Sequence, residues 1–280
     1  MYIDYPFLFI IFIIGASVGS FLNLVAYRSI HGGKIITTRS ACTSCKHTLS
    51  YSDLVPIFSF LLLKGKCRYC GKPISWQYPL VEAATGLVFI VSALTTHRTS
   101  GSLLEPSFAV LPNIWGLFFT LFVASVFIVL FVTDLKDGLI PDRIIFLSII
   151  AAFFYKLSLV AISLFQQNPV NTFYDFGASL LLAFLFAGFF YAAIWGTSGK
   201  AMGGGDVKYA FFIGLALGWP AAVVGFFLAF LTGAGAAVML ILTGYKRFGQ
   251  TVPFGPFLSI GGLISLFWGQ QLFNWYVGLF

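Results

Sequence analysis

Eight long apolar stretches place the strongest constraint on what this chain can fold into. In the chain, 59% of residues are hydrophobic and 9% are charged, whereas a soluble domain carries about 25% charged residues. A helix needs about 20 apolar residues to cross a bilayer. The sequence therefore predicts an all-α polytopic membrane protein with about eight transmembrane helices. The predicted spans are 7–27, 79–96, 112–133, 144–165, 176–195, 207–218, 220–243 and 254–272.

One of these stretches, 207–218, is short for a bilayer. We expect 207–218 either to tilt against its neighbours or to form a hairpin with the next stretch around Gly218–Pro220.

A cleaved signal peptide carries its positive charge first, but here Asp4 precedes the first stretch and Arg28 follows it. We therefore expect an anchor whose N-terminus lies outside.

Alternation from that start places nearly all positive charge on one side of the membrane. The four inner loops, at about 28–78, 134–143, 196–208 and 244–252, contain all of the 16 lysines and arginines except Arg98 and Lys156. Positive charge marks cytoplasmic loops, so the distribution supports this orientation. It also accounts for the net charge of +7 without nucleic acid as a partner.

Two aspartates at the predicted cytosolic rim form a candidate catalytic pair. Asp134 ends the third stretch in "FVTDLKDGLIPDRI", and Asp206 follows Gly203, Gly204 and Gly205 in "KAMGGGDVKYA". Glycines lack a Cβ, so another backbone can approach the carboxylate closely and an extended peptide has room there. Two neighbouring carboxylates in a low-dielectric site share one proton, leaving one to activate water while the other polarises a carbonyl. This is the chemistry of an aspartyl protease.

Other interpretations of the acids stay open. Asp137 is also explained as a solvated loop charge, and Asp142 as a turn or cap residue beside Pro141. Asp206 by itself is compatible with a stray acid in a glycine-rich loop. A proton- or ion-coupled transporter also uses carboxylates in membranes, but we expect its acids near the bilayer midplane rather than at one rim.

Two CxxC pairs lie in the loop 28–78 between the first two predicted helices. "CTSC" provides Cys42 and Cys45, "CRYC" provides Cys67 and Cys70, and 21 residues separate the pairs. Four thiolates in two knuckles suit a tetrahedral structural zinc ion. The cytosolic side keeps thiols reduced, so disulfides are disfavoured; a redox dithiol or unligated cysteines are the alternatives. Four cysteine ligands leave no open position for catalysis, so this zinc would fold the loop.

The sequence resembles the type IV prepilin peptidase family along nearly its whole length. The combination of both cysteine pairs, IPD and GxGD is far more specific than GxGD alone. Many relatives have a proline after the first cysteine, where this chain has Thr43, a departure with little bearing on metal binding. The similar segments are "GASVGSFLNLVAYR" (15–28), "LLLKGKCRYCGKPISWQYPLVEAATG" (61–86), "TDLKDGLIPD" (133–142), "GGGD" (203–206) and "VPFGPFLSIG" (252–261).

This resemblance implies a bacterial inner-membrane enzyme with two activities. It implies that Asp134 and Asp206 cleave the basic leader of a type IV prepilin or pseudopilin after a glycine, at the cytosolic face. It also implies that the new N-terminal residue is methylated with S-adenosylmethionine. The family associates the transferase with the cysteine loop, where "LKGKC" makes Gly65 and Lys66 candidates. We expect an N-terminal helix, a cysteine domain and a transmembrane peptidase domain at 1–27, 28–78 and 79–280.

The residues proposed for methyl transfer have alternative explanations. Lys64 and Lys66 are equally well explained as topogenic or phosphate-facing charges. A lipid-facing carboxylate is costly, so Glu82 must face protein or a polar cavity; it is either structural or holds the methyl-acceptor amine. The sequence lacks the glycine-rich nucleotide loop of a Rossmann methyltransferase. Three classes remain: a protease with methyltransferase activity, a protease without it, and a transporter or zinc-stabilised scaffold.

Overall fold

In the residues that the structure describes, the chain forms helices and no strands, and eight long helices follow the eight predicted spans one by one. The computed structural model describes residues 5–33, 39–100, 110–165, 170–197, 199, 202–245 and 252–280. The predicted fold class is confirmed for this part of the chain. The long helices are α1 (Tyr5–His31), α3 (Gln77–Ser100), α4 (Val110–Asp137), α5 (Asp142–Phe165), α6 (Val170–Gly196), α7 (Gly204–Leu217), α8 (Ala221–Leu242) and α9 (Gly255–Val277).

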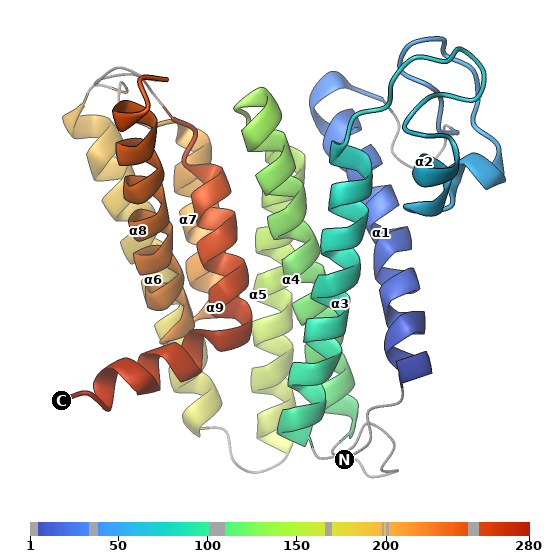
Figure 1. Ribbon diagram of the computed structural model, residues 1–280. Coiled ribbons are helices and arrows are strands. Elements are labelled where there is room, and N and C mark those ends of the chain that lie inside the picture. Colours follow the sequence, from blue (N-terminus) through green and yellow to red (C-terminus); the bar gives the residue numbers. More distant parts are fainter. Residues whose placement is uncertain are drawn as a thin grey trace. The chain divides into compact units, whose positions relative to one another are not determined.

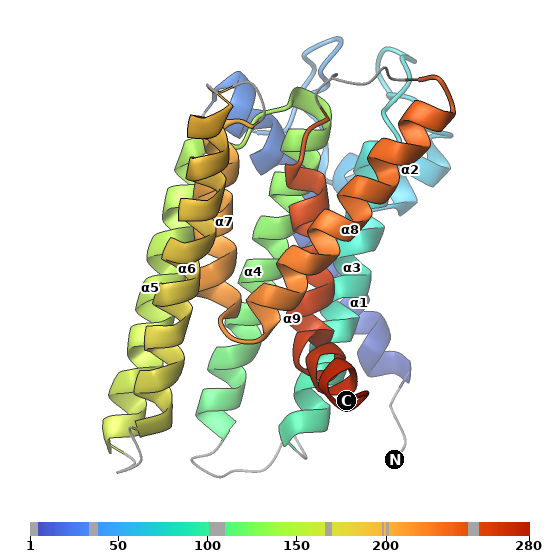
Figure 2. The same cartoon turned by 90° about the vertical axis from the view of Figure 1, so that its left-hand side faces the viewer.

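Six of the helices in the described residues, α1, α3, α4, α5, α6 and α8, are long and apolar enough to cross a membrane. By contrast, α7 has 14 residues, which is about 21 Å at the α-helical rise and shorter than a hydrocarbon core of about 30 Å. It ends at Leu217 and α8 begins at Ala221. These helices form the hairpin expected around Gly218–Pro220, and Figure 2 shows α8 running obliquely from this turn.

The helices divide into two compact units, Met1–Val129 and Leu130–Phe280, with the division inside α4. In the first unit, α1 and α3 lie side by side and the cysteine loop lies at one end of the pair (Figure 1). Two glycines of α1 permit this packing. A Cβ at Gly15 would lie 2.8 Å from the Cα of Gly86, and one at Gly19 would lie 2.8 Å from the Cα of Glu82. Small residues of this kind allow membrane helices to approach closely.

In the second unit, α7 contacts α5, α6, α8 and α9. Its side chains are correspondingly buried: Tyr209 and Phe212 are fully buried, and Ile213 and Leu215 are 1% exposed. Contact on all sides explains how a helix too short to cross a bilayer is held in the bundle. It also holds the first turn of α7, which carries Asp206, in a fixed place.

Part of the predicted orientation rests on residues outside the described ranges. These are Lys34, Lys200, Lys246 and Arg247, and the side chain of Arg98 also falls outside. The outward N-terminus and the cytosolic catalytic face therefore stay predictions. The division into domains at 1–27, 28–78 and 79–280 stays a prediction as well.

Candidate active site and metal centre

Asp134 lies in the last turn of α4 and is buried, at 6% exposure of the residue. The N–H of Gly138 donates to the Asp134 carbonyl over 3.0 Å, and the positive φ of Gly138 then ends the helix. Among the described residues, Oδ2 of Asp134 makes no hydrogen bond of ordinary geometry, but the backbone N–H of Gly255 is close enough to interact with this carboxylate. Buried polar atoms are nearly always paired, so this oxygen is available to a water molecule or a substrate.

Asp206 lies in the first turn of α7, after the N-cap residue Gly203. Its N–H donates to the Gly203 carbonyl over 3.1 Å, and a helix N-terminus favours a carboxylate. Asp134 and Asp206 are close enough for their charges to interact. The structure thus brings together two acids that lie 72 positions apart in the sequence. Their catalytic role stays a prediction.

Two contacts hold the loop between α4 and α5 against the start of α7. A Cβ on Gly205 would lie 3.1 Å from the Cβ of Ile140, so a larger residue there would displace Ile140 by a few tenths of an ångström. Nearby, the Lys208 ammonium is 2.6 Å from Oδ1 of Asp142. Asp142 therefore begins α5 and also forms an ion pair. The sequence analysis considered it only as a turn or cap residue and did not predict the ion pair.

The first two glycines of the GGGD segment lie next to open space. Among the described residues, no atom comes within 4 Å of the place where a Cβ on Gly203 or Gly204 would lie. The third glycine, by contrast, packs on the α4–α5 loop. Among the described residues, the backbone beside Asp206 is therefore open, and an extended peptide at this place stays a prediction.

The start of α9 contributes residues that the sequence analysis missed. A Cβ on Gly255 would lie 2.5 Å from Oδ2 of Asp134, so the α9 backbone faces this carboxylate directly. One turn along α9, the Ser259 hydroxyl donates to the Gly255 carbonyl over 2.9 Å. Ser259 and Tyr209 also share a hydrogen bond of 2.7 Å between their buried hydroxyls. These bonds connect the helix of Asp206 to the backbone beside Asp134.

The four cysteines form a cluster that could hold a metal ion. All four Sγ atoms lie within 4.8 Å of one another, and those of Cys42 and Cys70 are 3.9 Å apart. A tetrahedral ion with Zn–S bonds of about 2.3 Å requires sulfur atoms about 3.8 Å apart. The cluster therefore fits such an ion. The thiols interact with one another: the backbone N–H of Cys45 lowers the pKa of Cys42 to about 6. At Cys70 the backbone N–H of Lys72 lowers the pKa, but burial and the other three thiols together raise it to about 11. A metal ion requires the thiolate form of its cysteine ligands.

Both CxxC pairs have the same backbone geometry. The N–H of Lys46 donates to the carbonyl of Cys42, and the N–H of Gly71 donates to that of Cys67, each over 2.9 Å. The donor residue has a positive φ in both cases, 61° for Lys46 and 69° for Gly71. The repeated turn aims two sulfur atoms from each segment at one point.

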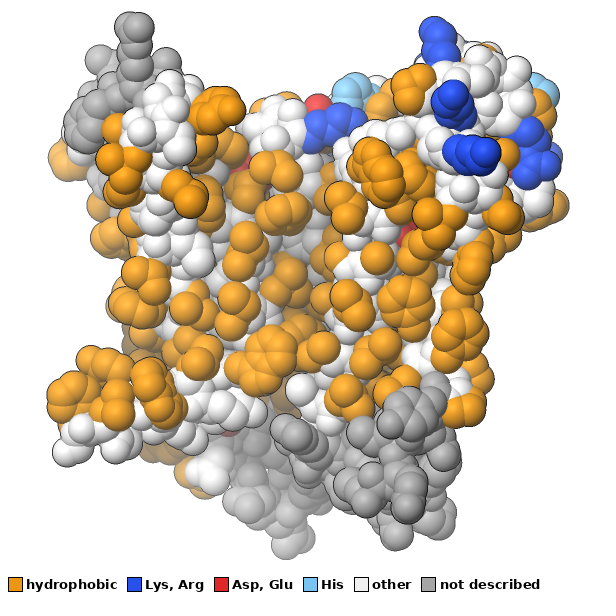
Figure 3. All heavy atoms as spheres, viewed as in Figure 1, with side chains coloured by type: hydrophobic (Ala, Val, Ile, Leu, Met, Phe, Trp, Pro, Cys, Tyr) orange, Lys and Arg blue, Asp and Glu red, His pale blue; other side chains and the backbone are white. Residues whose placement is uncertain are grey.

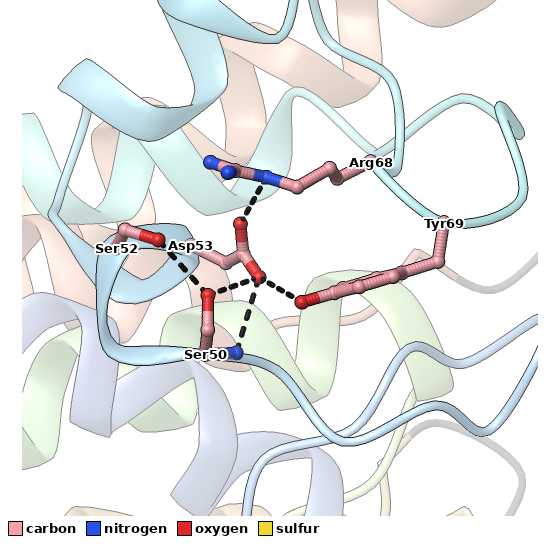
Figure 4. Close-up of polar contacts among 5 residues, drawn as sticks. All are labelled: Ser50, Ser52, Asp53, Arg68 and Tyr69. Atoms are coloured by element: carbon pink, nitrogen blue, oxygen red, sulfur yellow. Dashed lines mark hydrogen bonds and ion pairs between the residues drawn. The ribbon is translucent and has the colours of Figure 1, made fainter.

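Asp53 connects the segment before α2 (Phe58–Leu62) to the second CxxC pair (Figure 4). It accepts hydrogen bonds from the N–H and hydroxyl of Ser50, at 3.1 and 2.7 Å, and from the Tyr69 hydroxyl at 3.1 Å. Arg68 places its Nε 2.8 Å from the same carboxylate. Burial alone would raise the pKa of Asp53, but the bonds from Ser50 and Tyr69 and the charge of Arg68 hold it below the usual value. Sequence reasoning missed this residue.

The three candidates for methyl transfer lie in the first unit. Gly65 has a φ of 69° and follows α2, and a Cβ there would lie 3.1 Å from the Phe60 ring. Lys66 comes next and is exposed. Glu82 is buried in α3, where its Oε2 accepts the N–H of Ile57 over 2.7 Å. The geometry of Glu82 favours the structural alternative, because its carboxylate already holds the N-terminus of α2.

Comparison with known proteins agrees with these features. Residues 13–96 match the Bacterial Peptidase A24 N-terminal domain, and residues 121–238 match the Type IV leader peptidase family. A prepilin leader peptidase/N-methyltransferase of Bacillus subtilis is 34% identical over 273 residues, covering 96% of this chain and 97% of that protein. A Legionella pneumophila protein of the same name is 32% identical over 247 residues, covering 86% and 76%. No solved structure matches. The chain belongs to the type IV leader peptidase family.

Proposed function

We propose that the chain is an intramembrane aspartic endopeptidase that removes the leader of type IV prepilins or pseudopilins. The observation that carries this proposal is the approach of Asp134 and Asp206, with a buried Oδ2 on Asp134 that makes no hydrogen bond of ordinary geometry in the described residues. The carboxylates lie in the last turn of one helix and the first turn of another. This position at helix ends favours peptide hydrolysis over a transport path, whose acids we expect in mid-membrane.

The proposed cleavage uses the two carboxylates as general base and general acid. The ionised carboxylate takes a proton from a water molecule, whose oxygen then attacks the carbonyl carbon of the scissile bond. The protonated carboxylate donates a hydrogen bond to the carbonyl oxygen. When the C–N bond breaks, the leaving amine takes a proton from the pair. The open backbone at Gly203 and Gly204 is where the extended substrate would lie, beside Asp206.

We further propose N-methylation of the new N-terminal residue, supported by the names of the relatives. S-adenosylmethionine would supply the methyl group, and Gly65 and Lys66 are the candidates to bind or orient the donor. Zinc at the four cysteines would stabilise the loop without taking part in chemistry, because its ligand set is complete. The protein would work in the bacterial inner membrane, with a cytosolic active site.

Mass spectrometry of a prepilin co-expressed with this chain tests both activities. We expect the pilin N-terminus to lack its leader and to carry one methyl group, and membranes without the chain to yield intact prepilin. Uncut prepilin in the presence of folded enzyme would contradict the peptidase. Cut but unmethylated pilin would contradict the transferase alone.

A further inference from the structure

One side of α2 carries large apolar side chains that are exposed in the structure. Phe58, Leu61 and Leu62 are 54%, 58% and 81% exposed, and their spacing places them on the same face of the helix. We call these three residues the α2 face. On the opposite side, Phe60 is buried and its ring lies 4.9 Å from that of Trp76. Of the large apolar side chains named here in α2, three are thus exposed to the surroundings and one is buried against the protein.

The position of α2 along α3 is set by a hydrogen bond. The N–H of Ile57, directly before α2, donates to Oε2 of Glu82. Glu82 is five residues into α3, about 7 Å from its first residue, Gln77, along the helix axis. The span Gln77–Thr95 is itself apolar enough to cross a membrane. Both views show α2 beside the loop-side end of α3 rather than beyond it (Figures 1 and 2).

The charges in the loop around α2 are mostly positive. Lys64, Lys66, Arg68 and Lys72 are exposed in the segment that follows α2, and the loop 28–78 contains a single acid, Asp53, already paired with Arg68. Figure 3 shows Lys and Arg side chains gathered over this loop, with hydrophobic side chains below them along the helices. Anionic lipid headgroups attract basic segments next to membrane helices.

We infer that the α2 face docks into the lipid bilayer that α1 and α3 cross, with the basic segment at the level of anionic headgroups. An apolar face at the depth of the first turns of a membrane helix, flanked by lysine and arginine, matches an interfacial helix, which sinks about 5–10 Å into the boundary of headgroups and acyl chains. Leu80, in the first turn of α3, is exposed as well.

Docking gives the cysteine loop a fixed place on the membrane surface. Gly65 and Lys66 lie three and four residues after the end of α2, so they would lie at the height where a membrane-embedded pilin presents its new N-terminus. That consequence rests on the proposed function. The docking does not, since it follows from the α2 face, the Glu82 bond and the basic segment.

Spin labels on the full chain, reconstituted in liposomes of phosphatidylethanolamine and phosphatidylglycerol, test the docking. A keto-reactive nitroxide on p-acetylphenylalanine at position 62, replacing Leu62, avoids the four cysteines. The matched control places the label at Lys46, which is also exposed. Oxygen concentrates in lipid, whereas a nickel chelate stays in water. The collision rate of each nitroxide with the two reagents is measured. We expect the ratio of oxygen collisions to nickel collisions to be higher for the label at position 62 than for the label at position 46.

Two results at position 62 would overturn the inference. A label that collides more with nickel would show that the α2 face lies in water. A label shielded from both reagents would show that protein, from this chain or a partner, covers it. The metal content of each labelled chain must equal that of the unlabelled protein. If the Leu62 variant loses its metal, a label at Phe58 on the same face decides between the same outcomes.

Discussion

Substitution of Gly255 by alanine should slow leader cleavage without unfolding the protein. The added methyl would lie 2.5 Å from Oδ2 and 2.9 Å from Cγ of Asp134, whereas ordinary non-bonded contacts of a carbon atom begin at about 3.5 Å. Either the carboxylate or the start of α9 must therefore move by about 1 Å. A misplacement of about 1 Å can cost about 100-fold in rate, and we expect a loss of this order in kcat.

The assay measures initial rates of prepilin cleavage by purified enzyme, together with its thermal unfolding. Gly235→Ala in α8 is the matched control, because no described atom lies within 4 Å of where its Cβ would be. We expect this control to cleave at the rate of the unchanged enzyme. Wild-type cleavage by Gly255→Ala would refute the reasoning, as would an equal loss of rate in both variants.

Three further substitutions have expected outcomes. Asp53→Asn should lower the metal affinity by about 10-fold or more, because the loss of an outer-shell partner has an effect of this size. Competition with a chromogenic chelator measures the affinity. The control is Ser52→Ala, which removes only the hydroxyl that bonds Ser50 and should retain the metal. Tyr209→Phe should lower the free energy of unfolding by about 1–2 kcal/mol, and adding Ser259→Ala should cost less than the sum of the single changes in denaturation experiments. Lys66→Ala should weaken methylation more than cleavage, measured on the same pilin N-terminus; equal loss of both activities would contradict this division.

The helices and the cysteine cluster were predictable because their signals are local in sequence. Hydropathy alone located the eight long helices found in the described part of the chain, and the CxxC spacing identified four sulfur atoms that the structure brings within 4.8 Å of one another. The short α2 escaped this approach. Five residues do not make a periodic pattern, and α2 forms where the Glu82 carboxylate and the Phe60–Trp76 contact hold it.

The surroundings of the aspartates were not predictable, because they depend on contacts between distant segments. Gly255 lies 121 positions after Asp134, and nothing in "VPFGPFLSIG" indicates which residue faces the carboxylate. The pairing of Tyr209 with Ser259 likewise needs the packing of α7 on α9. The role of Asp53 depends on the fold in the same way, because the fold places Arg68 and Tyr69 beside it.

The most direct test of the aspartate pair is the fate of prepilin in membranes that contain Asp134→Asn or Asp206→Asn enzyme. Each change removes a titrating oxygen and preserves the size of the side chain, and residues that act as one catalytic unit fail together. Asp137→Asn, three residues from Asp134 in the same helix, is the control and should still cleave. Mass spectrometry of the pilin N-terminus should find only intact leader with either catalytic variant. Cut pilin at the wild-type level from Asp134→Asn or Asp206→Asn would contradict the assignment.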